Sequence, residues 1–266
     1  MFEDKSFRVV VNIAGWLAMV FLVFPVILTV VVSFNGSQFI EFPPTSFSLD
    51  WYANISSIHR IGSATLISLG IGLMAAGLAT VFAIGAALVL VRYPLPAKPV
   101  LTAFLLSPVT LPTVAIGIAL IQFFIMLDVA FTWYSLVFGH IVLIVAYPIR
   151  TIIASLTLSD TSLDEAAASL GAGRLTVFRT ITLPQLRPGL ISGFLFAFLI
   201  SFDNYPISIF LVRGELTTMP IEVFNYISQN LDPTPAAFST LYIVIVSIVI
   251  MLAERRYGII SLAVGK

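Results

Sequence analysis

The side chains that could carry chemistry are few in this 266-residue chain, and they are widely spaced. There are two histidines, His59 and His140, and there is no cysteine, so disulfides and thiolate metal sites are excluded. The chain contains no GxxxxGK[ST] phosphate loop, no HExxH sequence and no GxSxG sequence. Without a nucleophile and base in a recognisable pattern, we predict no catalytic residues, no metal site and no cofactor held by this chain.

Asp203 is the acid whose position in the sequence is most unusual. It lies in SFDNY, residues 201–205, within an otherwise apolar stretch, and about 15 residues after Pro188, or roughly 22 Å along a helix. A charged group inside a bilayer costs up to about 2.5–3.5 kcal/mol, so Asp203 should face water or a partner. We predict that Asp203, Asn204 and Tyr205 line a solute path that attracts cations. The alternative is a structural acid that is paired within a helix bundle or extends outward to the membrane surface.

A polar segment, Ser162–Pro184, separates two long apolar regions and reads SLDEAAASLGAGRLTVFRTITLP. Ser162 and Glu165 have the spacing of a capping box, so a helix is expected to begin at Ser162. Gly171 stands where a left-handed cap would end that helix. A second short helix is expected over residues 173–182, because the proline that closes the segment cannot continue it. The pattern alone is equally compatible with an ordinary amphipathic loop between two membrane helices.

The composition places these polar segments in a membrane protein. The chain is 59% hydrophobic and 10% charged, and its mean hydropathy is +1.07. These values predict an all-α, polytopic membrane protein surrounded by lipid, and a net charge of zero suggests no nucleic-acid partner. A membrane-crossing helix needs about 20 apolar residues. The expected spans are residues 9–32, 61–91, 99–127, 133–153, 188–212 and 236–253, with a cytoplasmic loop at 154–187 and one domain over 1–266.

Glycine, alanine and proline indicate how the spans should pack. The second span is rich in small residues, which favours close helix packing within the chain. Pro108 and Pro112 should kink the third span, and Pro206 should open the fifth locally. The external loop at 33–60 is expected to carry a short interfacial helix around its FSLDWY sequence.

The Lys and Arg residues predict the orientation of the chain in the membrane. Of the thirteen, only Arg60 and Arg213 fall on the predicted outer side. The remaining eleven are Lys5, Arg8, Arg92, Lys98, Arg150, Arg174, Arg179, Arg187, Arg255, Arg256 and Lys266. Because basic residues are retained in the cytoplasm, both termini and the polar segment are expected there.

The polar segment resembles the EAA loop of ABC importer permeases. The anchors of that loop are matched at the family spacing by Glu165, Ala166, Ala167, Gly171, Ile181, Leu183 and Pro184. In the family, this loop forms a coupling helix that docks into a groove of the ATP-hydrolysing subunit. The resemblance therefore implies that these residues contact such a subunit, which would bind the ATP and magnesium.

The resemblance extends over nearly the whole chain. FSLDWY (residues 47–52), LLSPVTLPTVAIGIAL (residues 105–120) and the runs around SFDNYPIS and TTMPIEVFNYI are similar to the second permease of the spermidine/putrescine branch. This implies a six-helix bundle of the type I ABC importer kind in a bacterial inner membrane. It also implies a sister permease forming a heterodimer, two copies of the ATPase subunit and a solute-binding protein that delivers a polyamine or related amine.

One departure from the branch leaves the solute open. Relatives often carry two adjacent acids in the fifth span, and here the second position is Asn204. Members of the same class carry opines, phosphonate compounds or iron, which are the alternative solutes. From other classes, the alternatives are a stand-alone channel, which would be complete by itself, and an intramembrane enzyme, which would need a set of acids or histidines that this chain lacks.

Overall fold

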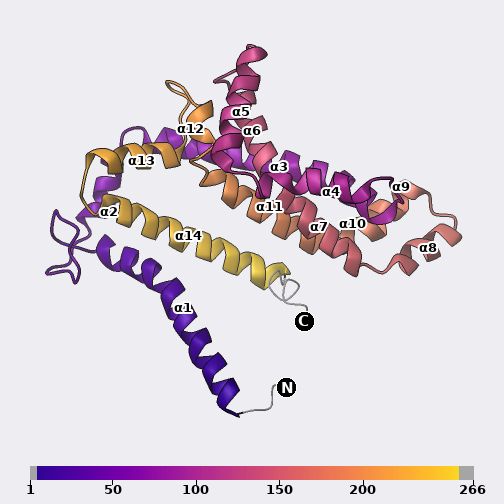
Figure 1. Ribbon diagram of the computed structural model, residues 1–266, viewed down its shortest axis with the longest axis horizontal. Helices are drawn as coiled ribbons and strands as arrows, with labels where there is room; N and C mark the ends of the chain where they lie inside the picture. The colour runs from indigo at the N-terminus through magenta and orange to yellow at the C-terminus, as the bar shows by residue number, and fades with distance from the viewer. Residues whose placement is uncertain (1–4, 258–266) are drawn as a thin grey trace. The chain divides into compact units, whose positions relative to one another are not determined.

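The computed structural model describes residues 5–257, and this part of the chain is built from helices (Figure 1). Its longest helices are α1 (Lys5–Ser33), α3 (Ile61–Arg92) and α14 (Thr234–Tyr257). Those of intermediate length are α4 (Lys98–Leu106), α5 (Thr113–Met126), α6 (Trp133–Ile144), α7 (Ala146–Leu158), α8 (Thr161–Ser169), α11 (Arg187–Phe202) and α13 (Met219–Gln229). The short turns are α2 (Asp50–Asn54), η1 (Ile55–Ser57), η2 (Ser107–Val109), α9 (Arg174–Val177), η3 (Phe178–Thr182), α10 (Leu183–Gln185) and α12 (Ser208–Leu211).

The chain divides into two compact units. Among the described residues, one unit contains residues 5–61 together with Val223–Ile250, and the other contains Gly62–Glu222 and residues 251–257. The second unit holds α3 to α12, and therefore both the polar segment and Asp203. The single permease domain expected from the sequence stays a prediction.

Three helices match three of the expected spans closely. α1, α3 and α14 are each long and apolar enough to cross a membrane. They cover the expected ranges 9–32, 61–91 and 236–253 and extend beyond each by at most a few residues. Three further pairs of helices could each form one bent span, which gives up to six spans by length and composition.

The expected third span, residues 99–127, is not one kinked helix. Lys98–Val109 and Thr113–Met126 meet at an angle of 98°. Pro108 lies in the turn η2, and Pro112 is the residue that precedes α5. Because neither proline can donate a backbone hydrogen bond, the helix ends between them rather than bending gently. The sequence predicted the position of the bend correctly and greatly underestimated its size.

The fourth and fifth spans are also broken. α6 and α7 meet at 43°, and the helical path continues to Leu158, beyond the expected end at residue 153. Within the expected fifth span, residues 188–212, α11 ends at Phe202 and α12 begins at Ser208. Pro206 lies between them, so the local opening predicted there is confirmed. The break leaves backbone groups that must find partners inside the protein.

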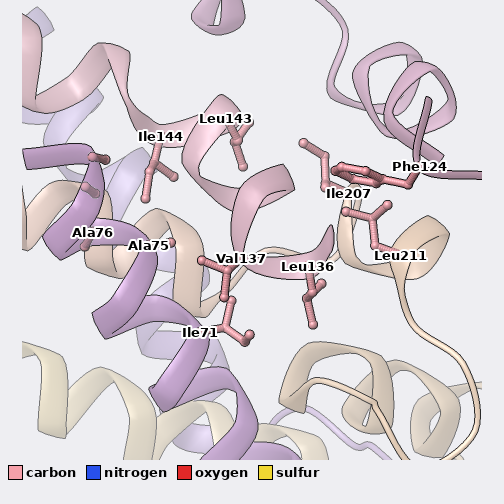
Figure 2. Packing of buried hydrophobic residues seen from close by; sticks show 12 residues of the cluster. Ile71, Ala75, Ala76, Phe124, Leu136, Val137, Leu143, Ile144, Ile207 and Leu211 are labelled. Carbon is pink, nitrogen blue, oxygen red and sulfur yellow. The ribbon is translucent and has the colours of Figure 1, made fainter. Parts of the chain in front are cut away.

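The core of the second unit is made of two apolar clusters. One contains Ile71 and Ala75 of α3, residues of α6, and Ile207 and Leu211 from the end of the broken span. Figure 2 shows Ile207 and Leu211 beside Phe124 of α5. The other cluster joins the second half of α3 to α7 and to Leu186. The small residues of α3 are used unequally, because Gly72, Ala75 and Ala76 are buried whereas Gly85 is exposed.

α7 and α11 run side by side and are in close contact (Figure 1). Their approach depends on two glycines of α11. A Cβ atom at Gly189 would lie 2.7 Å from the carbonyl oxygen of Thr151, and one at Gly193 would lie 2.8 Å from Cα of Pro148. The Thr151 hydroxyl donates a 2.8 Å hydrogen bond to the Gly189 carbonyl, as small-residue helix contacts in membranes permit.

The first unit is tied together by polar side chains near the end of α13. Asn54, at the end of α2, donates to the Tyr226 hydroxyl at 3.1 Å and to the Thr234 hydroxyl at 2.8 Å. Tyr226 in turn donates to Asp232 at 2.7 Å. The short helix expected in the 33–60 loop is therefore present as α2, and it is anchored to the start of α14.

Candidate functional site

The first helix of the polar segment is capped by Asp160 rather than by Ser162. The Asp160 carboxylate accepts a 2.9 Å hydrogen bond from the Ser162 amide, and α8 begins at Thr161. The capping box predicted from Ser162 and Glu165 is therefore wrong. Asp160 supplies a carboxylate acceptor two residues earlier, and this acceptor satisfies an amide of the first turn of the helix. These bonds hold the pKa of the Asp160 carboxyl below its ordinary value.

The end of α8 is the one predicted. Gly171 has φ +87°, the left-handed conformation that favours glycine. The Gly171 amide donates to the Ala168 carbonyl at 3.0 Å, and the Ala172 amide donates to the Ala167 carbonyl at 3.1 Å. These two bonds are the Schellman pattern, which satisfies the last carbonyls of a helix. α8 is thus a short helix that is capped at its N-terminus by Asp160 and ended at its C-terminus by Gly171.

The residues that match the family loop fall into an exposed group and a supporting group. Glu165, Ala166 and Gly171 are exposed, and Ala167 is half-buried on the same helix. The supporting group, also half-buried, is Ile181, Leu183 and Pro184. Beside the exposed group, α8 presents apolar side chains to the outside, because Leu163 and Leu170 are 49% and 89% exposed.

An ion pair holds α8 to the end of α3. Asp164 Oδ2 lies 2.6 Å from Arg92 Nη2, although the angles at these two atoms are not those of a hydrogen bond. The other Asp164 oxygen accepts a 2.9 Å hydrogen bond from the Thr182 hydroxyl. Together these contacts connect three elements around an open pocket of about 280 Å³. Sequence patterns did not predict this ion pair, because Arg92 and Asp164 are far apart in the chain and give no local signal of pairing.

The helix after Gly173 continues farther than expected. α9 runs into the π-helical turn η3 and then into α10, which contains Pro184 near its start. The prediction that Pro184 would stop the helix is wrong, because proline is tolerated in the first turn of a new helical segment. The path bends by 66° only at the step from α10 to α11. α10 is connected to the start of α8 through Gln185, whose side-chain oxygen accepts a hydrogen bond from the Asp160 amide at 3.0 Å.

The three residues predicted to line a solute path lie at the opposite end of α11, and their side chains differ in exposure to the outside. Asp203 follows the last residue of α11 and is exposed, whereas Asn204 is buried and Tyr205 is half-buried. The Asn204 side-chain oxygen accepts a 3.0 Å hydrogen bond from the Ile207 amide. Asn204 therefore helps to close the turn, and Asp203 is the carboxylate left available at the break. Their role in a solute path stays a prediction.

The two histidines lie in different surroundings. His59 is exposed. His140 is buried, and its ring contacts the hydroxyls of Ser201 and Ser208. Among residues 5–257, no cluster of three or more His, Asp or Glu side chains is arranged to hold a metal ion.

Comparison with known proteins places this arrangement in a family. Residues 79–260, more than half of the chain, match the family described as the binding-protein-dependent transport system inner membrane component. This is a family of transport permeases and not of enzymes. The matched region includes α8, the ion pair with Arg92 and the break at Asp203.

Relatives with assigned names match over almost the full length. The chain is 33% identical over 252 residues to the putrescine transport system permease protein PotI of Escherichia coli (strain K12), covering 92% of this chain and 88% of that protein. It is 28% identical over 234 residues to the spermidine/putrescine transport system permease protein PotC of Haemophilus influenzae, covering 88% of this chain and 91% of that protein.

A solved structure shares the fold. It is a bacterial ABC transporter involved in the import of the acidic polysaccharide alginate, and one of its chains superposes with a TM-score of 0.70 at 14% identity, over 96% of this chain and 99% of that chain. The predicted all-α fold of an ABC importer permease is thereby confirmed. The chain belongs to the family of inner-membrane components of binding-protein-dependent transport systems, as a multi-pass permease that acts with an ATPase, a solute-binding protein and a sister permease.

Proposed function

We propose that this chain forms half of the translocation pore of a polyamine importer and receives the work of ATP hydrolysis through α8. In this proposal both termini and α8 lie in the cytoplasm, the second half of the pore is a different permease, and two copies of the ATPase subunit bind below. ATP and magnesium are held by those subunits and not by this chain.

The observation that carries the coupling role is the exposed face of α8. An isolated helix of nine residues is not stable in water, yet α8 has a cap at each end and an ion pair to α3. Leu163 on α8 is 49% exposed, and Leu170, the residue that follows the helix, is 89% exposed. A rigid helix that offers an exposed leucine beside Glu165 and Ala166 is suited to dock into a groove of a partner.

The coupling role is tested by reversing the charge of the docking face. In Glu165→Lys, we expect the permease to remain in the membrane while uptake falls at least about tenfold, which corresponds to 1.4 kcal/mol of lost interaction. The ATPase subunit should no longer co-purify with it. Asp50→Lys, an equally exposed reversal in the first turn of α2, is the matched control. Normal uptake and normal co-purification in Glu165→Lys would contradict the proposal.

The amine solute is supported by the printed functions of two relatives and by the exposed Asp203. PotI and PotC are named as putrescine and spermidine/putrescine permeases. Asp203 supplies one carboxylate at the break in the fifth span, where the neighbouring Asn204 has its side-chain oxygen occupied. A single carboxylate at this position is suited to meet one ammonium group of the solute at a time.

The solute is tested with the whole transporter in cells that lack other amine importers. We expect labelled putrescine to be taken up, and Asp203→Asn to raise the KM for uptake at least about fivefold through loss of a charge-assisted contact worth roughly 1 kcal/mol or more. Asp128→Asn is the control, because Asp128 is exposed and its positive φ is tolerated by asparagine. Uptake of an opine, a phosphonate compound or iron in place of putrescine would contradict the polyamine assignment.

A further inference from the structure

The ring of His140 lies between two serines that stand on either side of the break in the fifth span. Nδ1 is 2.7 Å from Oγ of Ser201, in the last turn of α11, and Nε2 is 3.0 Å from Oγ of Ser208, the first residue of α12. The exposed fractions of these residues are 1%, 2% and 0% for His140, Ser201 and Ser208. One side chain of α6 therefore bridges the two helical pieces that the break separates.

The hydroxyl of Ser208 fixes the direction of these hydrogen bonds. It donates its hydrogen to the carbonyl oxygen of Asn204 at 2.5 Å, so its oxygen can only accept from the ring. Nε2 of His140 must then carry the hydrogen that Ser208 accepts. In the neutral imidazole the other nitrogen, Nδ1, accepts from the hydroxyl of Ser201. The chain of bonds runs from α11 through the ring to α12 and back to Asn204.

The same bonds satisfy the interior of the break. Asn204 accepts from the Ser208 hydroxyl with its carbonyl and from the Ile207 amide with its side chain. Irregular backbone at membrane depth is stable only when such groups have partners inside the protein. In this conformation of the turn Asn204 is buried, and the adjacent Asp203 is exposed. The conformation that buries Asn204 is thus the one that presents Asp203.

Packing beside the ring holds α12 in the same place. A Cβ atom at Gly139 would lie 3.7 Å from Cγ2 of Ile207 and would overlap a methyl group of Leu211. α6 therefore approaches the end of the break closely through a glycine next to His140. Figure 2 shows Ile207 and Leu211 within the apolar cluster formed with α5 and α6. The ring is the polar contact in an otherwise apolar contact surface between α6 and α12.

We propose that His140 is a positioning residue, which clasps the break between α11 and α12 and thereby sets where Asp203 is presented. His140 does not contact the solute in this account, and it acts through Ser201, Ser208 and Asn204. The link to transport rests on the proposed role of Asp203 in the solute path. The link between His140 and the position of residue 203 stands on the geometry alone.

Thiol labelling measures the position of residue 203 without requiring transport. The chain has no cysteine, so Asp203→Cys introduces its only thiol. In the purified transporter we expect this thiol to react readily with a charged maleimide. Adding His140→Ala should slow the reaction at least about fivefold, the lower end of the range for coupling between two sites. His140→Gln, which keeps one donor and one acceptor, should restore much of the rate.

Two controls separate positioning from general damage. Ser135→Ala removes an equally buried hydroxyl from α6, but Ser135 bonds only within the cap formed with Thr132. It should leave the labelling of residue 203 unchanged. The exposed Leu170→Cys reports on α8, and its labelling should not respond to His140→Ala.

Uptake kinetics provide the second readout. With Asp203 intact, His140→Ala should raise the KM for putrescine. The factor by which the KM rises should be about five times the factor by which the maximal rate falls, because the carboxylate is misplaced and not removed. If His140→Ala lowers only the yield of protein, and leaves both the labelling rate at residue 203 and the KM unchanged, the proposal is wrong. If the wild-type transporter does not take up putrescine, the proposed function fails while the labelling comparison still decides the role of His140.

Discussion

The two ends of α11 obtain their structure in different ways. At the N-terminal end, both termini of α8 in the polar segment are set by neighbours in sequence, because Asp160 caps the helix and Gly171, about three turns later, ends it. At the C-terminal end, the break at residues 203–207 is completed by a side chain from α6. The first region is exposed, as the docking role proposed for α8 requires, whereas the second is largely buried and leaves the carboxylate of Asp203 exposed. Substitutions at the polar segment should therefore impair coupling without unfolding the protein, whereas substitutions at the break should affect the KM for the solute and the amount of folded protein.

The largest effect is expected where α11 packs against α7, because this contact holds α11 in place and the two compared regions lie at the two ends of α11. Gly193→Val would place methyl groups against Cα of Pro148, from which a Cβ atom would be only 2.8 Å away. Overpacking of this kind costs about 1–3 kcal/mol or more. We expect a large loss of folded permease, measured by fluorescence-detected size-exclusion chromatography. Gly77→Ala is the control, because a Cβ atom there would meet nothing within 4 Å. Equal yields of Gly193→Val and Gly77→Ala would show that the contact between α7 and α11 is not needed to hold the two ends of α11 in place.

A smaller and more selective effect is expected at Gly171. A β-branched residue in the left-handed region costs at least about 1–2 kcal/mol, but the site is exposed and a Cβ atom would meet nothing within 4 Å. Gly171→Val should therefore leave the amount of permease unchanged while ATP-driven uptake falls about tenfold. Gly173→Ser is the matched control, since Gly173 has an ordinary φ of −66° in the N-cap position, where serine is favoured. Normal uptake by Gly171→Val would remove the distinction between the two ends.

The sequence predicted the features that depend on local patterns and missed the contacts between residues that are far apart in the chain. Gly171 was identifiable because a cap is a local pattern, and the long spans were identifiable because apolar length is also local. The pairing of Arg92 with Asp164, and of His140 with Ser201 and Ser208, joins residues far apart in the chain. No spacing rule predicts such pairs. The cap was misplaced because Ser162 and Asp160 are both good cap residues and only the backbone decides between them.

The ion pair at the loop should contribute less than the cap that ends it. Arg92 and Asp164 are partly exposed, with 26% and 12% of their side chains accessible, so water weakens their attraction. We expect Asp164→Asn to reduce uptake about two- to fivefold, corresponding to roughly 0.4–1 kcal/mol. Arg92→Met should cause a similar loss, and the double variant should be no worse than either single one. Additive losses would show that the two residues act separately.

The smallest effect concerns the protonation of Asp160. Its pKa is lowered by the hydrogen bonds from Ser162, so the cap stabilises α8 fully above the ordinary carboxyl pKa of about 4. This stabilisation is lost as the pH falls through the lower pKa of the folded state. The anisotropy of a dye on Leu170→Cys should therefore decrease below about pH 4. Asp160→Asn keeps a cap acceptor that does not titrate, so its anisotropy should be insensitive to pH in this range. If the anisotropy fell equally at low pH with and without Asp160→Asn, a titratable group other than Asp160 would be responsible.

The most direct test of the account is the accessibility of residue 170 from each side of the membrane. Leu170 is 89% exposed on α8 and should lie on the cytoplasmic side against the ATPase subunit. With Leu170→Cys as the only thiol in the chain, an impermeant maleimide should not label intact cells. It should label inside-out vesicles stripped of the ATPase subunit, and restoring that subunit should block the labelling. Labelling of intact cells, or labelling of vesicles that the ATPase subunit does not block, would contradict the coupling role of α8.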